Sequence, residues 1–143
     1  MSKSLAIELK RLNNALTRFS SKEAKKFGIT AAQMSLIDFL YRTEGEEPIF
    51  QTDIEKEFNI QKSSATALLK LMEKKELIVR VVSQTDSRYK QIMLTPRARK
   101  SGEKIRAVYK ENDAHLKDVL GNDADSMLNN VLKLQAALEK LNE

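Results

Sequence analysis

Apolar residues recur at helical spacing through most of this 143-residue chain, and one stretch alone changes period. Near the start, the apolar positions Leu5, Leu9, Leu12, Leu16 and Phe19 lie four and three residues apart in turn. Residues 77–83 are instead rich in Val and Ile, residues 84–87 are polar, and residues 89–94 alternate in period two. The first spacing is typical of a helix, and the second of paired strands. The sequence therefore predicts a mainly α fold with one small β-hairpin.

Turn and capping residues divide the rest of the chain into six helices. The expected ranges are about 5–28, 30–43, 51–58, 62–75, 96–121 and 122–141. Thr30 with Gln33 predicts a capping box at the second helix, and Thr52 with Glu55 predicts another at the third. Asn59 tolerates a left-handed backbone and can supply the turn before the fourth helix. Thr95, ahead of a proline, is expected to cap the long fifth helix.

Charge is unevenly distributed along the chain. The net charge is only +5, but residues 62–100 contain ten basic and three acidic side chains, a net charge of +7. Residues 111–143 are acidic, with a net charge of −4. This uneven distribution of charge is expected when only one surface of a protein has to meet phosphates.

The length of the chain fits a single domain over residues 1–143.

Composition argues against several classes of function. The chain has no cysteine and one histidine, His115, so thiol chemistry and sites built from several histidines are excluded. We find no glycine-rich phosphate loop and no Ser/His/Asp arrangement, and therefore expect no enzyme activity, no cofactor and no metal. The apolar runs are too short to cross a bilayer, which predicts a cytoplasmic protein with no membrane partner.

Two helices, a short turn and a hairpin predict a winged helix-turn-helix lobe over about residues 30–95. The second helix of the pair begins with amide, hydroxyl and ammonium groups, which can reach base edges and phosphates in a major groove. The candidate DNA contacts from this helix are Gln61, Lys62, Ser63, Ser64, Thr66 and Lys70. Thr66, Ala67 and Lys70 are expected on the solvent side.

The hairpin tip supplies the second candidate contact. Arg88 lies on a loop that can enter a minor groove, and Asp86 can fix the direction of its guanidinium by a charge-assisted hydrogen bond. Lys90 is a further candidate DNA contact. This lysine and the three basic residues of 97–100 lie either beside phosphates or free in solvent.

The ordered motifs of this region resemble the MarR (multiple antibiotic resistance regulator) family. They are Asp53-Ile54, Phe58-Asn59-Ile60 and Lys62-Ser63-Ser64-Ala65-Thr66, then Leu71-Met72-Glu73-Lys74-Lys75 and Leu77-Ile78, and finally Asp86-x-Arg88 with Leu94-Thr95. The resemblance implies that residues 61–66 begin the recognition helix and that Asp86 and Arg88 form the wing motif. Three positions depart from the family pattern. Glu76 and Ala98 stand where glycines are common, and Glu55 replaces a common small residue in the short third helix. Glu76 is expected to affect the geometry of the helix cap.

The resemblance also implies a homodimer on a pseudo-palindromic operator in double-stranded DNA, usually a repressor relieved by a ligand. The dimerisation helices would be about residues 1–28 and 96–143. A small aromatic or apolar effector would bind between these helices and the lobe. Candidate effector contacts are Arg18, Tyr41, Tyr109 and His115.

Dimerisation also follows from the apolar pattern, because the first, fifth and sixth helices carry more apolar surface than one small lobe can cover. The leading hypothesis is a sequence-specific, dimeric DNA-binding transcriptional regulator. The alternative is a helical interaction or scaffold protein whose basic segment meets solvent or an acidic partner. A different winged-helix family and a small enzyme are weaker alternatives.

Overall fold

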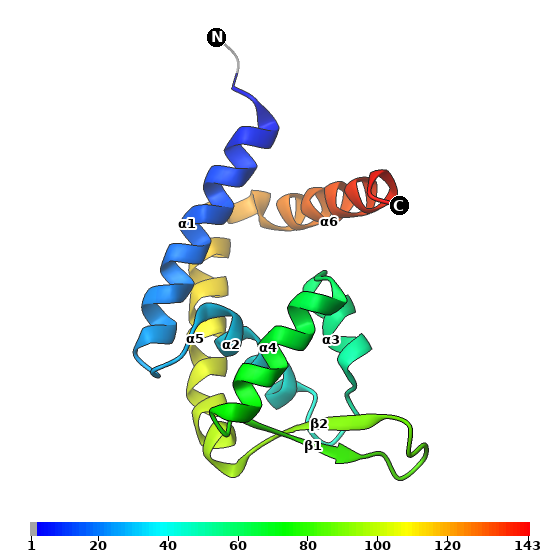
Figure 1. Ribbon diagram of the computed structural model, residues 1–143. Helices are drawn as coiled ribbons and strands as arrows, with labels where there is room; N and C mark the ends of the chain where they lie inside the picture. Colours follow the sequence, from blue (N-terminus) through cyan, green and yellow to red (C-terminus); the bar gives the residue numbers. More distant parts are fainter. Residues whose placement is uncertain (1–2) are drawn as a thin grey trace. The chain divides into compact units, whose positions relative to one another are not determined.

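The computed structural model describes residues 3–143, and this part of the chain is mainly helical with one two-stranded sheet (Figure 1). The elements are α1 (Leu5–Lys25), α2 (Ala31–Arg42), α3 (Gln51–Phe58), α4 (Lys62–Lys74), β1 (Ile78–Val82), β2 (Lys90–Leu94), α5 (Pro96–Leu120), the 3-10 helix η1 (Gly121–Asp123) and α6 (Ala124–Leu141). The predicted fold class and element order are confirmed. The first and last helices begin or end a few residues from the expected bounds.

The chain forms two compact units, Met1–Arg106 and Ala107–Glu143, and the division falls inside α5. The first unit contains α1 to α4, the hairpin and the first three turns of α5. The second contains the rest of α5 with η1 and α6. The predicted bounds of the DNA-binding lobe (about 30–95) and of the dimerisation helices (about 1–28 and 96–143) were assigned by function. The division into compact units does not test them, and they stay predictions.

The core of the first unit is built around α2. Seven of the eight residues from 33 to 40 in this helix are buried. Met34, Leu36 and Ile37 are at most 1% exposed. A helix that is apolar on most sides needs partners on most sides. The other elements contribute further buried residues to the core: Ile54, Leu69, Met72, Ile78, Ile92, Leu94 and Ile105.

A buried ion pair links α2 to the middle of α5, at the last residue of this unit. The Asp38 carboxylate is nearly inaccessible and accepts hydrogen bonds from Arg42 Nε at 2.9 Å and Arg106 Nη1 at 3.1 Å. Both bonds end on Oδ2, while Oδ1 is buried without a partner among the described residues, so the two guanidinium groups compensate only part of the carboxylate's lost hydration. The link therefore helps to fix the position of α2 against α5.

One of the two expected capping boxes is present. Gln33 N donates to Thr30 Oγ1 at 3.2 Å and Thr30 N donates to Gln33 Oε1 at 3.1 Å, as predicted for α2. The box expected from Thr52 and Glu55 is wrong, because α3 already begins at Gln51 and Thr52 is its second residue. There, the Phe50 backbone N–H donates instead to the Asp53 carboxylate at 2.8 Å.

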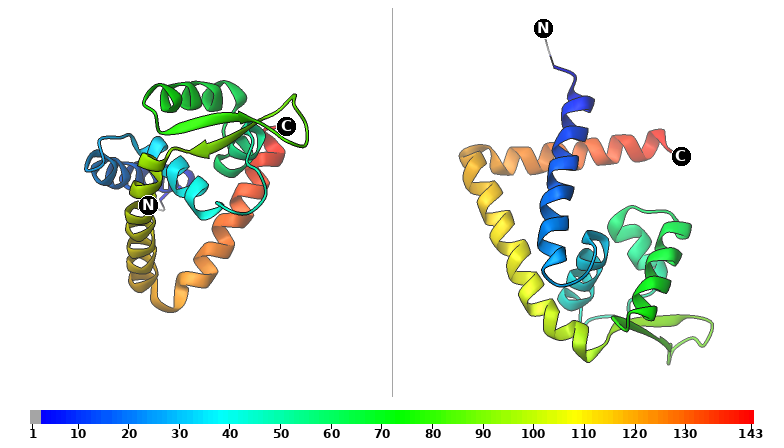
Figure 2. Two further views of the ribbon diagram at one scale, coloured as in Figure 1. Left: turned by 90° about the horizontal axis from the view of Figure 1, so that it is seen from below. Right: turned by 60° about the vertical axis from the view of Figure 1, so that its left-hand side comes forward.

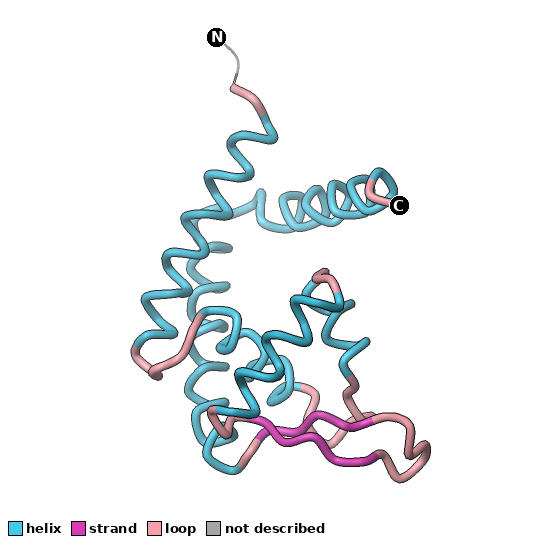
Figure 3. The backbone as a smooth tube through the Cα atoms, in the orientation of Figure 1, coloured by secondary structure: helices cyan, strands magenta, loops and turns pink. Residues whose placement is uncertain are grey.

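The hairpin is a wing whose base is anchored and whose tip is a loop. The strands are antiparallel, with Arg80 opposite Ile92. Ile92 N donates to the carbonyl of Ile49 at 2.8 Å, which ties β2 to the segment before α3. The loop beyond the strands extends away from the helices of this unit in all three views (Figures 1 and 2). Figure 3 shows that this tip has no regular secondary structure.

Two turns of the lobe use left-handed backbone at residues other than glycine. Asn59, which ends α3, has φ 50° and ψ 50°, as predicted. Glu76, which follows α4, has φ 59°. The position where the family resemblance led us to expect a glycine is therefore one that favours glycine, because a Cβ is strained there.

Apolar side chains remain exposed in both units. In the first unit they lie on α1, on the hairpin and at Leu71 of α4, and in the second they lie on the end of α5 and on α6, which has no buried residue. They include Leu5, Ile7, Leu12, Leu16, Phe19, Leu116, Val119, Leu120, Leu128, Leu132, Leu138 and Leu141. Over residues 3–143, no helix has the length and apolar character needed to span a membrane.

Candidate nucleic-acid interface

Helix α4 has one buried and one open face. Ala65, Leu69 and Met72 are fully buried. On the other side, four exposed residues follow the helical repeat of four, three and four positions: Ser63, Ala67, Lys70 and Lys74. Residues with this spacing lie above one another on a single helix face. We call these four residues the open face of α4.

The predicted contacts at the start of α4 are accessible. Gln61, Lys62, Ser63 and Ser64 are all exposed. Gln61 occupies the N-cap position, but its side chain makes no capping hydrogen bond. The polar groups at this end of the helix are therefore presented to solvent, together with Lys70 further along.

Thr66 does not lie on the solvent side as predicted. The residue is half-buried, and its Oγ1 accepts a hydrogen bond from Gln51 Nε2 at 2.8 Å. It stands between the open face and the buried face, on the side of α4 that meets α3. The periodicity of α4 alone did not show which flank α3 would cover.

The other end of α4 is held by charged side chains. Arg97 donates to the carbonyls of Lys75 and Glu76 just after the helix ends, and the Glu76 carbonyl also accepts from Thr95 Oγ1 at 2.8 Å. Lys75 Nζ donates to Gln33 Oε1 at 3.2 Å, which joins this end to α2. Arg97 is therefore bound within the protein, which neither of its two sequence-based interpretations anticipated.

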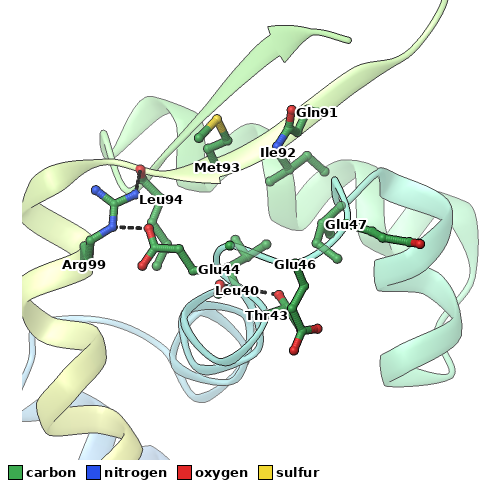
Figure 4. Close-up of a pocket in the computed structure, with 12 residues that line it drawn as sticks. Leu40, Thr43, Glu44, Glu46, Glu47, Gln91, Ile92, Met93, Leu94 and Arg99 are labelled. Atoms are coloured by element: carbon green, nitrogen blue, oxygen red, sulfur yellow. Dashed lines mark hydrogen bonds and ion pairs between the residues drawn. The ribbon is translucent and has the colours of Figure 1, made fainter. Parts of the chain in front are cut away.

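Arg99 has the same kind of role. Its Nε donates to the Glu44 carboxylate, and its Nη2 lies 3.4 Å from the carbonyl of Leu94 (Figure 4). The pair closes one end of a cavity of about 60 Å³ between the end of α2, the segment after it and β2. Within residues 97–100, only Lys100 remains as an exposed cation without such a role in the lobe.

The wing tip holds its arginine as predicted. Arg88 Nη2 donates to Asp86 Oδ2 at 2.7 Å and Arg88 Nε to Asp86 Oδ1 at 3.1 Å, which makes the pair bidentate. The backbone N–H of Arg88 donates to the same carboxylate at 3.0 Å. These bonds lower the pKa of Asp86 from its ordinary 3.8 and raise the pKa of Arg88. The pair is therefore charged at neutral pH, and acid would break it only below the ordinary carboxyl pKa.

An aromatic platform supports the tip, and sequence reasoning missed it. The Arg88 guanidinium carbon lies 5.7 Å from the centre of the Tyr89 ring, and that ring is 5.9 Å from the Phe50 ring. Arg88 keeps 79% of its side-chain surface exposed. The neighbouring Arg-Tyr pair was visible in the sequence, whereas the approach of Phe50 depends on the fold.

The exposed cations of this region surround α4 and the wing. Lys62, Lys70 and Lys90 were expected from the sequence, and all are exposed. Lys74 was missed, although it lies four residues after Lys70 and therefore on the same face. The exposed lysines on the open face of α4 and on the wing take part in no described ion pair. Arg88 and Arg99 are each paired with one carboxylate, whereas Arg97 is bound to uncharged carbonyls and keeps its positive charge.

The four candidate effector contacts fall in different units. In the first unit Arg18 is exposed on α1 and Tyr41 is half-buried on α2. In the second, Tyr109 is half-buried and His115 is exposed. Tyr41 packs against Gly102, at which an added Cβ would lie 2.7 Å from the Tyr41 ring. That contact gives Tyr41 a packing role in the first unit.

Comparisons with known proteins point to one family. Residues 27–88, which include α2 to α4, β1 and most of the wing loop, match the sequence profile of the MarR family. An uncharacterised HTH-type transcriptional regulator of Bacillus subtilis, YdgJ, is 30% identical over 95 residues. The match covers 66% of this chain, and the chain spans only about half (54%) of the length of that relative.

Solved structures extend the match to almost the whole chain. The transcription regulator MarR from Oenococcus oeni is 34% identical, with a TM-score of 0.84, over 94% of this chain and 99% of the other. Staphylococcus aureus MepR, in a complex with DNA, has a TM-score of 0.86 over 96% of this chain and 99% of the other. Its 24% identity supports the shared fold.

Proposed function

Because the chain belongs to the MarR family, we propose that it is a transcriptional regulator that binds double-stranded DNA in a sequence-specific way. In this proposal α4 enters a major groove and the wing tip reaches the adjacent minor groove. The relatives named above are transcription regulators, and one was solved on DNA. The proposal includes no enzymatic activity.

One observation carries the proposal most directly. The open face of α4 and the wing tip belong to the same compact unit. The open face presents exposed lysines to solvent, and the tip presents Arg88, which is paired with one carboxylate, Asp86. Ser63 and Ser64 add hydroxyl groups that can donate to or accept from base edges. An arginine whose direction is fixed in advance loses less rotamer entropy when it enters a groove.

We also propose that the protein acts as a homodimer. The exposed apolar residues of α1 and of α6 are numerous for a monomer, and a large contiguous apolar surface is usually covered by a partner. A two-fold dimer would present two α4 helices to a pseudo-palindromic site about one helical turn, or a multiple of it, apart. Repression relieved by a small aromatic or apolar effector remains part of the proposal.

The test is a selection of bound duplexes from a random pool, followed by titration of the recovered sequence and of a scrambled control. We expect a clear preference for the recovered sequence at equal salt. If no duplex is retained even at low salt, the chain does not bind DNA, and the scaffold alternative gains support.

The residues at the start of α4 give the selection a sharper readout. Lys62→Ala and Ser64→Ala should each reduce affinity by about 1–3 kcal/mol and change the recovered sequence if they contact bases. A variant that loses affinity equally for all duplexes would place its side chain at a phosphate instead.

A further inference from the structure

We propose that Gln51 is a positioning residue for DNA recognition, acting through Thr66 to set the rotation of α4 against α3. This inference rests on the proposed function, and it gives Thr66 a positioning role in place of the DNA contact expected from the sequence. Gln51 is the first residue of α3, and Thr66 lies one turn into α4. Their side chains form a hydrogen bond of 2.8 Å between the two helices.

The contact is placed where it can control the orientation of the open face. Gln51 Nε2 also lies 3.5 Å from the Lys62 carbonyl, so one amide approaches two successive turns of α4. Both side chains are half-buried at the flank between α3 and the open face. Helices that meet through apolar contacts alone can repack by small rotations, whereas a directional hydrogen bond favours one arrangement.

Rotation matters because Ser63, Ala67 and Lys70 share a face only a few ångströms from that contact along the helix. Base recognition needs hydrogen-bonding groups within a narrow range of distance and angle. A small rotation of α4 about its axis would move all three residues together. It would weaken hydrogen bonds to bases more than contacts with phosphates, because a charge contact tolerates a wider range of distances and angles. Gln51 and Thr66 are therefore expected to influence sequence preference more than general DNA affinity.

The C-terminal end of α4 is fixed by other contacts, so loss of the Gln51–Thr66 hydrogen bond should act mainly on the N-terminal half of the helix. Arg97 and Lys75 hold the helix C-terminus to α5 and α2. At the N-terminal end, the side chain of the N-cap residue Gln61 makes no capping hydrogen bond. Among the described contacts, the Gln51 amide is thus the polar link between α3 and the N-terminal half of α4.

The experiment is a double-mutant cycle of Gln51→Leu, Thr66→Val and the double variant, in the full chain. Each variant is titrated with the duplex selected by the unaltered protein and with the same duplex carrying single base changes. We expect each single variant to bind the selected duplex about fivefold more weakly, as for the loss of one hydrogen bond. The double variant should be no weaker than either single one, and affinity for scrambled DNA should stay within about twofold.

Thr66→Ser, which keeps the hydroxyl, should restore the preference, and thermal unfolding of every variant shows whether the fold is intact. Ala67→Ser, on the open face beside Thr66, is the matched control and should not couple to Gln51→Leu. Additive losses, or a change of preference at one base pair with Thr66→Val alone, would mean that Thr66 contacts DNA and would overturn the inference. An unaltered protein that selects no duplex would refute the proposed function, and the inference with it.

Discussion

At the scale of single residues, the wing arginine is the side chain whose loss should matter most. Arg88→Ala is expected to lower affinity for the selected duplex about tenfold, because it removes a pre-oriented cation from a groove contact. The melting temperature should change little, since an exposed ion pair stabilises a fold weakly. Titration by fluorescence anisotropy and a thermal melt measure the two effects.

Lys104→Ala is the matched control for that prediction, because it removes a similar exposed cation from α5. It should leave affinity for the selected duplex nearly unchanged. If Arg88→Ala and Lys104→Ala weaken binding equally, the wing acts only through net charge and takes no specific part in recognition.

Glu76 tests a residue-level strain. At φ 59° a side chain with a Cβ costs about 1–2 kcal/mol, against about 0.5–1 kcal/mol for the added backbone freedom of glycine. Glu76→Gly should therefore stabilise the protein by up to about 1.5 kcal/mol, seen as a higher urea midpoint. Glu76→Ala keeps the Cβ and should gain nothing. An equal gain from both variants would assign the effect to the lost charge.

At the scale of elements, the α2–α5 contact makes a prediction that runs against helix propensity. Gly102→Ala would normally favour a helix by about 1 kcal/mol. Here the new Cβ would lie 2.7 Å from Tyr41 Cδ2 and 2.9 Å from its Cγ, at the base of the ring. Displacing that ring should cost about 1–3 kcal/mol, so we expect a lower melting temperature.

Ser101→Ala, one residue earlier on the same helix, is the comparison for Gly102→Ala, and it should stay within about 0.5 kcal/mol of the unaltered protein. A Gly102→Ala variant that melts higher than the unaltered protein would show that Tyr41 moves without cost, and that the packing role assigned to this tyrosine is wrong.

Elements also show where sequence reasoning succeeds and where it ends. The helices and the Thr30–Gln33 cap were predictable because they depend on neighbours three or four residues apart, and the hairpin because two β-rich runs flank a short polar turn. The pairing of Asp86 with Arg88 was predictable for the same reason, since the two lie in one tight loop. Local spacing carries enough information to place these groups.

Contacts between elements were not predictable from the sequence. Thr66 was expected to face solvent, but α3 brings Gln51 against it. Arg97 and Arg99 were expected beside phosphates or in solvent, but they meet the end of α4 and Glu44. In each case the partner lies more than ten residues away in the sequence. Helical periodicity therefore predicts the helix face on which a residue lies, but not which element packs against that face.

At the scale of the whole molecule, the exposed leucines of α6 should form part of a subunit interface. Leu132→Glu would place a carboxylate in that interface, at a cost that favours separated chains. Sedimentation should show a shift from dimer to monomer at micromolar concentration. Lys133→Glu changes an adjacent exposed residue and should leave the dimer intact. A monomeric unaltered protein would contradict the assembly outright.

The most direct test of the account is a titration of the selected duplex at several salt concentrations, with the number of chains per duplex measured in the same solutions. Two chains that together neutralise about eight phosphates predict a slope near −7 for log K against log[salt]. The scrambled duplex should bind at least about a thousandfold more weakly. One chain per duplex, a flat salt response, or equal binding to both sequences would contradict the proposal that paired α4 helices and wings read a specific site.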